Sequence, residues 1–162
     1  MIRRNGYLNK LVDRIDDERV KIVTGLRRCG KSYLLFTIFH SWLRRHGYDT
    51  AHIVAIQLDD DEFVEQRTPR GLSSWVKARL PNDGGNCVVM IDEIQMCKPP
   101  EGAPANDTTF YDVLNSLRKK KGVSVYVTGS NSEMLSKDVA TNFRDRGVEI
   151  RVWPLSFGEL MA

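Results

Sequence analysis

Apolar residues along this chain occur in two patterns that alternate with each other. Short, almost unbroken apolar runs lie at residues 21–25, 52–58, 87–93 and 124–130. Runs of this length without polar alternation are typical of strands that are buried on both faces of a parallel sheet. A fifth run at 148–155 is less uniformly apolar and predicts one more strand.

Between these runs, apolar side chains recur at the three- and four-residue spacing of a helix that buries one face. The first and third such helices end in basic residues followed by Gly47 and Gly122, which suits the negative helix end and its left-handed cap. Strands that alternate with helices predict an α/β domain with a parallel sheet. The positions that define the three helices are Leu34, Leu35, Ile38, Phe39 and Trp42, then Leu72, Trp75, Val76 and Leu80, then Phe110, Val113, Leu114 and Leu117.

Three shorter segments complete the predicted elements. Residues 97–109 are rich in Pro, Gly and Asn, which predicts a mobile surface segment. The acidic stretch at 59–62 predicts a charged turn after the second strand, and a short helix is predicted from about Glu133.

Composition narrows the class of protein without deciding it. A chain of 162 residues is long enough for one domain with a real core. Its net charge of +3 is too small to argue for nucleic-acid binding, and no apolar run approaches the roughly 20 residues of a membrane span. The N-terminus lacks the apolar stretch of a signal peptide, and Cys29, Cys87 and Cys97 lack metal-ligand spacing. We therefore expect a cytoplasmic protein with no membrane segment.

The segment GLRRCGKS, at residues 25–32, carries the strongest chemical signal. It fits G-x-x-x-x-G-K-[ST] and lies after a predicted strand and before a predicted helix, which is the context that a phosphate-binding loop needs. Glycines allow a tight turn whose amides converge on one point, and the helix adds its positive end. Lys31 would reach the β- and γ-phosphates, and the Ser32 hydroxyl would ligate Mg²⁺. The expected nucleotide-binding residues are Gly25, Leu26, Arg27, Arg28, Cys29, Gly30, Lys31, Ser32 and Tyr33.

Two points about this loop stay open at the level of sequence. A glycine-rich turn in a Rossmann-like fold is the alternative, although the pattern G-x-G-x-x-G is absent. Arg27 and Arg28 could oppose phosphate charge or bind a neighbouring partner, or they could simply point into solvent.

The third apolar run, CVVMIDE, ends in two carboxylates. Open α/β sheets bind ligands at the carboxyl ends of their strands, so Asp92 is expected to hold Mg²⁺ directly or through water. Glu93 is one residue further on and faces the other way, so it could polarise a water aimed at the γ-phosphate. This arrangement favours hydrolysis over transfer to a small substrate. The alternative is an ordinary solvated strand end.

The fourth apolar run ends in VTGSNS, which offers a polar contact for the attacking water or the γ-phosphate. Asn131 is the first choice for this contact, followed by Thr128 and Ser130. Ser130 and Glu133 also fit the S-x-x-E capping box of a helix, so Ser130 could serve only as a cap.

These motifs together resemble a known family, the AAA-type ATPases of archaea and bacteria that carry a DUF4143 C-terminal domain. The resemblance rests on GLRRCGKS, on IDEIQ at 91–95, on VTGSNSEML at 127–135 and on VWPLSFGEL at 152–160. The opening YLNKLVDRID resembles the lead-in helix of that family, at about residues 5–16. The resemblance implies a P-loop NTPase core, a three-layer αβα sandwich with sheet order 5-1-4-3-2, and Mg²⁺-ATP as its ligand.

The resemblance also implies roles for individual residues. Lys31, Ser32, Asp92 and Glu93 would act as described above, and Asn131 or a neighbour would be the sensor on the fourth strand. Arg146 would be an arginine finger that reaches the site of the next subunit in a homo-oligomer. Asp145 stands where the family usually has glycine, and it could pair with Arg146 and hold it back. The alternative for Arg146 is a surface salt bridge.

Residues 1–162 would correspond to the ATPase core alone, without the lid and C-terminal domain that follow in the family. A core without its lid leaves the adenine pocket open on one side, so we expect weak hydrolysis. Two other functions remain open: a nucleotide-dependent interaction module with negligible turnover, and a nucleic-acid-associated protein. The basic pairs that favour the last are few, and two of the sets simply end helices.

Overall fold

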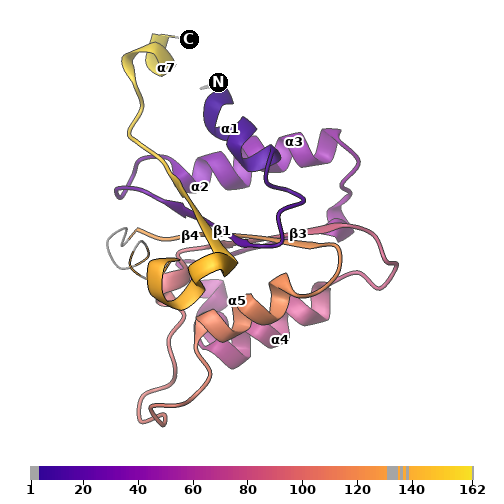
Figure 1. Cartoon of the computed structure of the whole chain (residues 1–162), viewed down its shortest axis with the longest axis vertical. Helices are drawn as coiled ribbons and strands as arrows, with labels where there is room; N and C mark the ends of the chain where they lie inside the picture. Colours follow the sequence, from indigo (N-terminus) through magenta and orange to yellow (C-terminus); the bar gives the residue numbers. More distant parts are fainter. Residues whose placement is uncertain (1–3, 131–134, 136, 138, 162) are drawn as a thin grey trace.

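Five strands form one parallel sheet in the computed structural model, which describes residues 4–130, 135, 137 and 139–161 (Figure 1). The strand order β2-β3-β4-β1-β5 is the expected order 5-1-4-3-2 read from the other edge, and every neighbouring pair is parallel. The strands are β1 (Val20–Thr24), β2 (Ile53–Gln57), β3 (Cys87–Asp92), β4 (Val123–Thr128) and β5 (Gly147–Arg151).

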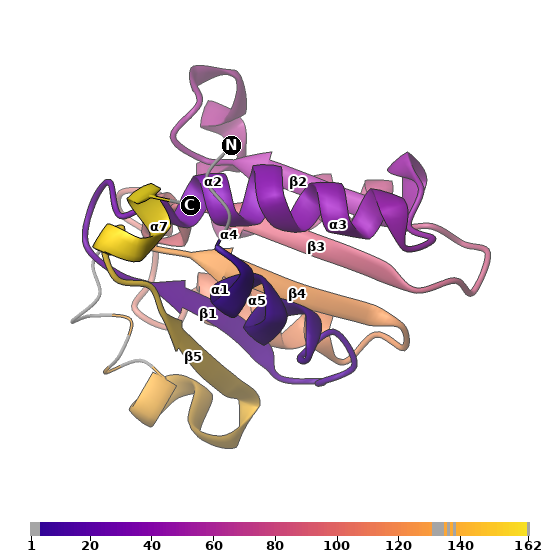
Figure 2. The ribbon, with the colours of Figure 1, turned by 90° about the horizontal axis from the view of Figure 1, so that it is seen from above.

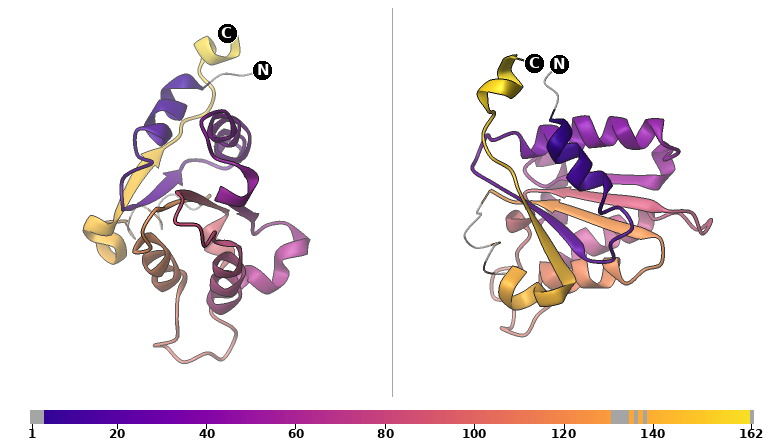
Figure 3. Two further views of the ribbon diagram at one scale, coloured as in Figure 1. Left: turned by 90° about the vertical axis from the view of Figure 1, so that its right-hand side faces the viewer. Right: turned by 45° about the horizontal axis from the view of Figure 1, so that its top comes forward.

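Helices cover both faces of the sheet, which makes the three-layer sandwich that the resemblance implied (Figures 1 and 3). On one face lie α1 (Asn5–Val12) and a continuous helix whose parts are α2 (Lys31–Tyr33), the π-helical η1 (Leu34–Phe39) and α3 (His40–Arg45). On the other face lie α4 (Pro69–Arg79) and α5 (Phe110–Arg118). Viewed from above, α1 and the continuous helix run side by side over the strands (Figure 2). Among the described residues, none of the helices is long and apolar enough to cross a bilayer.

The unbroken apolar runs are explained by burial on both sides. Side chains alternate along a strand, so Val89 and Ile91 of β3 pack toward α4 and α5. Val88 and Met90 pack toward α1 and the continuous helix instead. A strand between two helical layers has no face left for polar residues until it ends, at Asp92 in β3.

Four predicted segments differ from the structure or fall outside its described part. The lead-in helix ends at Val12 rather than near residue 16, because three-residue turn bonds replace the helical ones from Arg14 onward. Strand β5 stops at Arg151 rather than 155; Val152 still donates to the Thr24 carbonyl, but Pro154 has no N–H with which to continue. The charged turn leads into a short helix, η3 (Asp61–Arg67). The helix predicted from about Glu133 begins outside the described residues.

A buried lysine, Lys21, connects the segment between α1 and β1 to the sheet. The side chain of Lys21, on β1, is fully buried, and its Nζ donates to the Asp17 carbonyl at 2.7 Å and to the Ser124 hydroxyl at 2.9 Å. The ammonium also lies 4.9 Å from the centre of the Tyr126 ring. Burial lowers the pKa of Lys21 from 10.5 to about 8, because the charged form has lost its water.

This pKa predicts a pH dependence that Lys21→Met should remove. Between pH 8 and about 10.5 the unfolded chain binds a proton at Lys21 that the folded chain has released, so raising the pH favours the folded state. The unfolding free energy of the wild type, relative to that of Lys21→Met, should therefore rise across this window by up to about 3 kcal/mol. Urea unfolding at several pH values measures it, with exposed Lys77→Met as the matched control. A difference that stays flat with pH would contradict the assignment.

Candidate nucleotide-binding site

The phosphate-loop segment connects β1 to the start of α2, and its two glycines are required by the backbone. Gly25 has φ +151°, and a Cβ there would lie 2.4 Å from the Val152 carbonyl oxygen and 2.7 Å from the Cys29 Sγ. Gly30 has φ +92° at the residue before α2, a left-handed conformation that favours glycine. The chain therefore turns from strand into helix within the predicted motif.

A cavity of about 190 Å³ opens between this loop and the end of β3. It brings six of the nine expected nucleotide-binding residues together with Glu93. Gly25, Leu26 and Cys29 are not among the described residues that line it. The residues that line it are Arg27, Arg28, Gly30, Lys31, Ser32, Tyr33 and Glu93.

Arg27 and Arg28 are exposed to solvent and at the same time line this cavity. Both readings of the pair are therefore compatible with where they lie. Arg28 has φ +63°, which is uncommon for a residue with a side chain and is enriched at functional sites.

Lys31 is buried and turned back onto its own loop. Its Nζ donates to the carbonyl oxygens of Gly25 at 3.0 Å and Leu26 at 2.8 Å, and it lies 3.8 Å from the Cys29 Sγ. These neutral acceptors satisfy the ammonium without a counter-charge. A phosphate would offer a charged acceptor, and charge-assisted hydrogen bonds are stronger than those to carbonyls.

Asp92 lies at the carboxyl end of β3 and is bonded from both sides. Ser32 Oγ donates to its two carboxylate oxygens at 3.0 and 2.8 Å, and Thr128 Oγ1 on β4 also donates to Oδ1. Burial raises the pKa of Asp92, while the hydrogen bonds from Thr128 and Ser32 act in the opposite direction. Three elements that are distant in sequence thus meet at one carboxylate.

The Ser32 hydroxyl and the Asp92 carboxylate offer oxygen ligands that suit Mg²⁺. Magnesium prefers hard oxygen ligands, and it is usually held by one or two protein groups together with phosphates and water. In the part of the chain that the structure describes, no group of three or more His, Cys, Asp or Glu side chains could hold a metal ion. Ser32 and Asp92 would therefore hold Mg²⁺ together with the phosphates, rather than as a separate cage.

Glu93 adopts a left-handed backbone conformation, with φ +57°, and its amide donates to Thr128 Oγ1 at 3.0 Å. Its carboxylate accepts from Ser130 Oγ at 2.9 Å and also from Gln95 Nε2. Gln95 Nε2 in turn lies 3.1 Å from Ser130 Oγ. The carboxylate that was expected to face a water is thus held by two neighbouring side chains.

Sequence reasoning did not single out Gln95. The residue belongs to the IDEIQ segment that carries the family resemblance, and the short helix η4 (Ile94–Met96) folds it back toward Glu93. A polar residue two positions after the strand-end glutamate was the available signal. Gln95 contacts Glu93 only because the chain turns at η4, and the apolar periodicity does not predict that turn.

The polar residues at the end of β4 contact both carboxylates. Thr128 bonds to Asp92, and Ser130 bonds to Glu93, so the two second choices for this role lie at the site. Asn131, the first choice, lies outside the described residues, as does Glu133 of the alternative capping box.

Arg146 lies at the amino-terminal ends of the strands, whereas the phosphate loop lies at their carboxyl ends. It ends the short helix η6 (Arg144–Arg146), immediately before the start of β5, whereas the loop follows the end of β1. Because β1 and β5 are parallel, these positions are separated by the length of the strands. Arg146 is exposed, and among the ion pairs described it has no partner, Asp145 included. It therefore cannot reach the site of its own chain.

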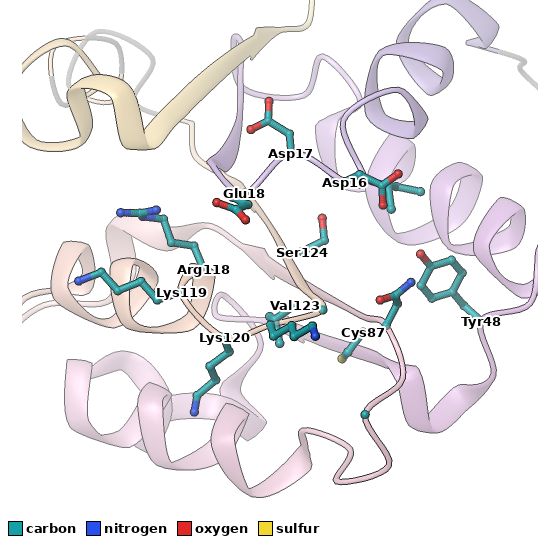
Figure 4. A pocket seen from close by; sticks show the side chains of 15 residues that line it. Asp16, Asp17, Glu18, Tyr48, Cys87, Arg118, Lys119, Lys120, Val123 and Ser124 are labelled. Carbon is teal, nitrogen blue, oxygen red and sulfur yellow. The ribbon is translucent and has the colours of Figure 1, made fainter.

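A larger cavity, of about 510 Å³, lies at the same amino-terminal ends of the strands as Arg146 (Figure 4). Acidic side chains from the segment after α1 line one side of it, and basic side chains from the end of α5 line another. Its charge is therefore mixed. The charged residues that line it are Asp16, Asp17, Glu18, Arg118, Lys119, Lys120 and Lys121.

A parallel sheet in this order, with a glycine loop after β1 and a carboxylate at the end of β3, defines a P-loop α/β fold. Solved structures share this fold at low sequence identity. Caenorhabditis elegans PCH-2 matches with a TM-score of 0.66 and 14% identity, over 95% of this chain and 44% of that one. A DNA polymerase III gamma subunit-related protein of Thermotoga maritima gives 0.62 and 9%, over 94% and 47%. Saccharomyces cerevisiae RIF2 gives 0.58 and 16%, over 97% and 58%.

The particular family follows from the sequence match. A family model described as an AAA domain matches residues 17–161, and this chain belongs to that family. An uncharacterized protein of Haemophilus influenzae is 30% identical over 99% of this chain, and one of Methanocaldococcus jannaschii is 29% identical over 88%. The chain spans only 38% and 28% of the lengths of these two relatives.

The bonds at Thr128 predict a large loss of stability for Thr128→Val, which keeps the shape of the side chain. The Glu93 amide would lose its acceptor and the buried Asp92 would lose a donor, so the unfolding free energy should fall by about 2–3 kcal/mol. Chemical denaturation measures this, with the exposed Thr50→Val as the control. A loss equal to that of the control would show that Thr128 is not needed at this carboxylate.

Proposed function

We propose that this chain binds Mg²⁺-ATP and hydrolyses it to ADP and phosphate. The observation that supports the proposal most directly is the group of hydrogen bonds that joins Ser32, Asp92 and Thr128 beside the phosphate loop. Membership of the AAA domain family supports a nucleotide as the ligand. The length of the relatives suggests that the domain works within a larger protein, whose activity would draw on this site.

The residues of the chain divide the task between binding and chemistry. Free amides at the start of α2 and the Lys31 ammonium would hold the β- and γ-phosphates once Lys31 leaves its own loop carbonyls. Ser32 and Asp92 would hold Mg²⁺, which when bound offsets negative charge on the phosphates. Phosphoryl transfer needs little covalent help from the protein, so positioning and charge supply most of the rate.

Glu93 would orient the attacking water and accept its proton. Its present contacts with Gln95 and Ser130 both fall on Oε2, so the water would be taken by Oε1. Arg146 would act only in a neighbouring copy, since it lies far from the loop of its own chain. A homo-oligomer that places Arg146 of one copy at the loop of the next would complete the site.

A nucleotide-dependent interaction module is the second candidate. It is favoured by the same contacts of Glu93, because hydrogen bonds from Gln95 and Ser130 to Oε2 fix the direction in which the carboxylate points. Such a module would bind ATP, turn it over negligibly, and present a different surface in the bound state. A nucleic-acid function has weaker support, because the basic end of α5 shares its cavity with acidic residues.

Nucleotide binding and turnover are tested by two substitutions. Lys31→Ala should weaken Mg²⁺-ATP binding by tenfold or more, because it removes the cation that pairs with the phosphates. Glu93→Gln should keep binding within a few-fold but lower phosphate release at least about 100-fold, as loss of a positioned base does. Calorimetry with and without Mg²⁺ and a phosphate-release assay give the two numbers.

The exposed Lys77→Ala, on α4, is the matched control for the loss of a lysine. Wild-type binding without measurable turnover would favour the interaction module over the hydrolase. Equal affinity in Lys31→Ala and the wild type would refute the phosphate-loop assignment itself.

A further inference from the structure

Arg4 joins three parts of the chain that are far apart in sequence. Its side chain is only 1% exposed and lies 4.5 Å from the centre of the Tyr7 ring. Its three nitrogens donate to different partners: Nε to Glu159 at 3.0 Å, Nη1 to the Cys29 carbonyl at 2.7 Å and Nη2 to the Trp153 carbonyl at 2.6 Å. The N-terminal segment, the phosphate loop and the C-terminal tail (residues 152–161) thus meet at one guanidinium.

Such an arrangement constrains geometry more than it adds stability. A buried cation costs desolvation free energy that its partners only partly return. A planar guanidinium presents its donors at fixed angles, so bonds in three directions hold all three partners in place. Figure 1 shows the tail and α1 on the same side of the sheet, which is what allows the first and last segments to share this contact.

The contact with Cys29 determines which way one peptide group of the loop faces. In a trans peptide, the C=O of one residue and the N–H of the next point in opposite directions. The Cys29 carbonyl points to Arg4, so the Gly30 N–H points away from Arg4. Gly30 lines the cavity of about 190 Å³, and Arg4 is not among the described residues that do. The hydrogen bonds described for the backbone leave this N–H without an acceptor.

We propose that Arg4 is a positioning residue for the phosphate cradle, by which we mean the backbone amides of the phosphate loop that face the bound phosphates. Arg4 holds the Cys29–Gly30 peptide so that its N–H is one of these amides. This inference rests on the proposed nucleotide binding. Arg4 touches no phosphate itself and acts through the Gly30 amide. Trp153 and Glu159 hold Arg4 in turn, so the tail supports the shape of the loop.

Glycine makes this peptide need support. Gly30 has no Cβ and a φ of +92°, so rotation of the peptide away from the cradle meets little steric resistance. Without Arg4 the loop would spend part of its time with a carbonyl facing the phosphates. Apparent affinity falls in proportion to the fraction of molecules that are competent to bind. The complex formed at saturation would be unchanged.

The tail contact gives the loop a link to the rest of the molecule. Glu159 lies in α7 (Phe157–Met161), and its carboxylate accepts from the Ser156 amide as well as from Arg4. Hydrogen bonds from the Ser156 amide and from Arg4 lower the pKa of Glu159. One carboxylate therefore caps α7 and orients Arg4, so movement of α7 would change the support of the loop.

The experiment compares Mg²⁺-ADP affinity in Arg4→Met and Arg4→Lys with that of the wild type. Arg4→Met should bind at least tenfold more weakly, and Arg4→Lys should fall between, because one ammonium cannot reach all three partners. Arg14→Met, at a partly exposed arginine just after α1, should bind like the wild type. With ATP, KM should rise while kcat stays within about twofold, since only the free loop is affected.

A second readout separates positioning from general stability. The Gly30 amide resonance of the nucleotide-free protein should shift in Arg4→Met, and its hydrogen exchange should change, while Arg14→Met leaves both in place. Should Arg4→Met fold poorly, Glu159→Gln provides a milder variant, which should weaken ADP binding two- to fivefold with an intact fold.

Wild-type affinity in Arg4→Met, or a loss of kcat with KM unchanged, would overturn the role of Arg4. These results leave the nucleotide proposal standing, because the wild type still binds. A wild type that binds no nucleotide would instead refute the proposed function and remove the cradle role with it.

Discussion

The site depends on a buried carboxylate, Asp92, that accepts hydrogen bonds from two other segments of the chain. Asp92 ends a strand that is apolar on both faces, and burial alone makes its charge unfavourable. Ser32 from the loop and Thr128 from the neighbouring strand donate to it, and Thr128 also accepts from the Glu93 amide. The loop, the third strand and the fourth strand are therefore aligned by the same few bonds that would position a metal and a phosphate.

Two buried cations donate hydrogen bonds to carbonyl groups of the phosphate loop. Lys31 belongs to the loop itself, and Arg4 comes from the N-terminal segment. Lys31 bonds to the carbonyls of Gly25 and Leu26 within the loop, and in the proposed complex a phosphate would take their place. Arg4 bonds to the Cys29 carbonyl, and it is not among the described residues that line the cavity of about 190 Å³. On the proposals made above, nucleotide binding would replace the first contact and leave the second in place, so the loop would be ordered before the ligand arrives. Preorganisation of this kind lowers the entropic cost of binding.

The family match and the site together place this chain as an AAA domain that accounts for a minority of its relatives' length. The exposed apolar side chains of the tail lie next to the residues that hold Arg4. If Arg4 positions the loop as proposed, a contact made on this tail would reach the loop through Glu159 and Arg4. The exposed large apolar residues of the tail are Trp153, Leu155, Phe157, Leu160 and Met161.

The sequence by itself determined the strands, the main helices and the loop motif, because burial on two faces and a turn between strand and helix leave local patterns. It also limited the strand-four contacts to a few residues, of which Thr128 and Ser130 meet the carboxylates. Only the tertiary structure decided that Gln95 holds Glu93 and that Arg4 supports the loop. The Arg4–Glu159 bond joins residues 155 positions apart, and no periodicity records a contact over that distance. Such contacts exist only once the sheet has brought the segments together.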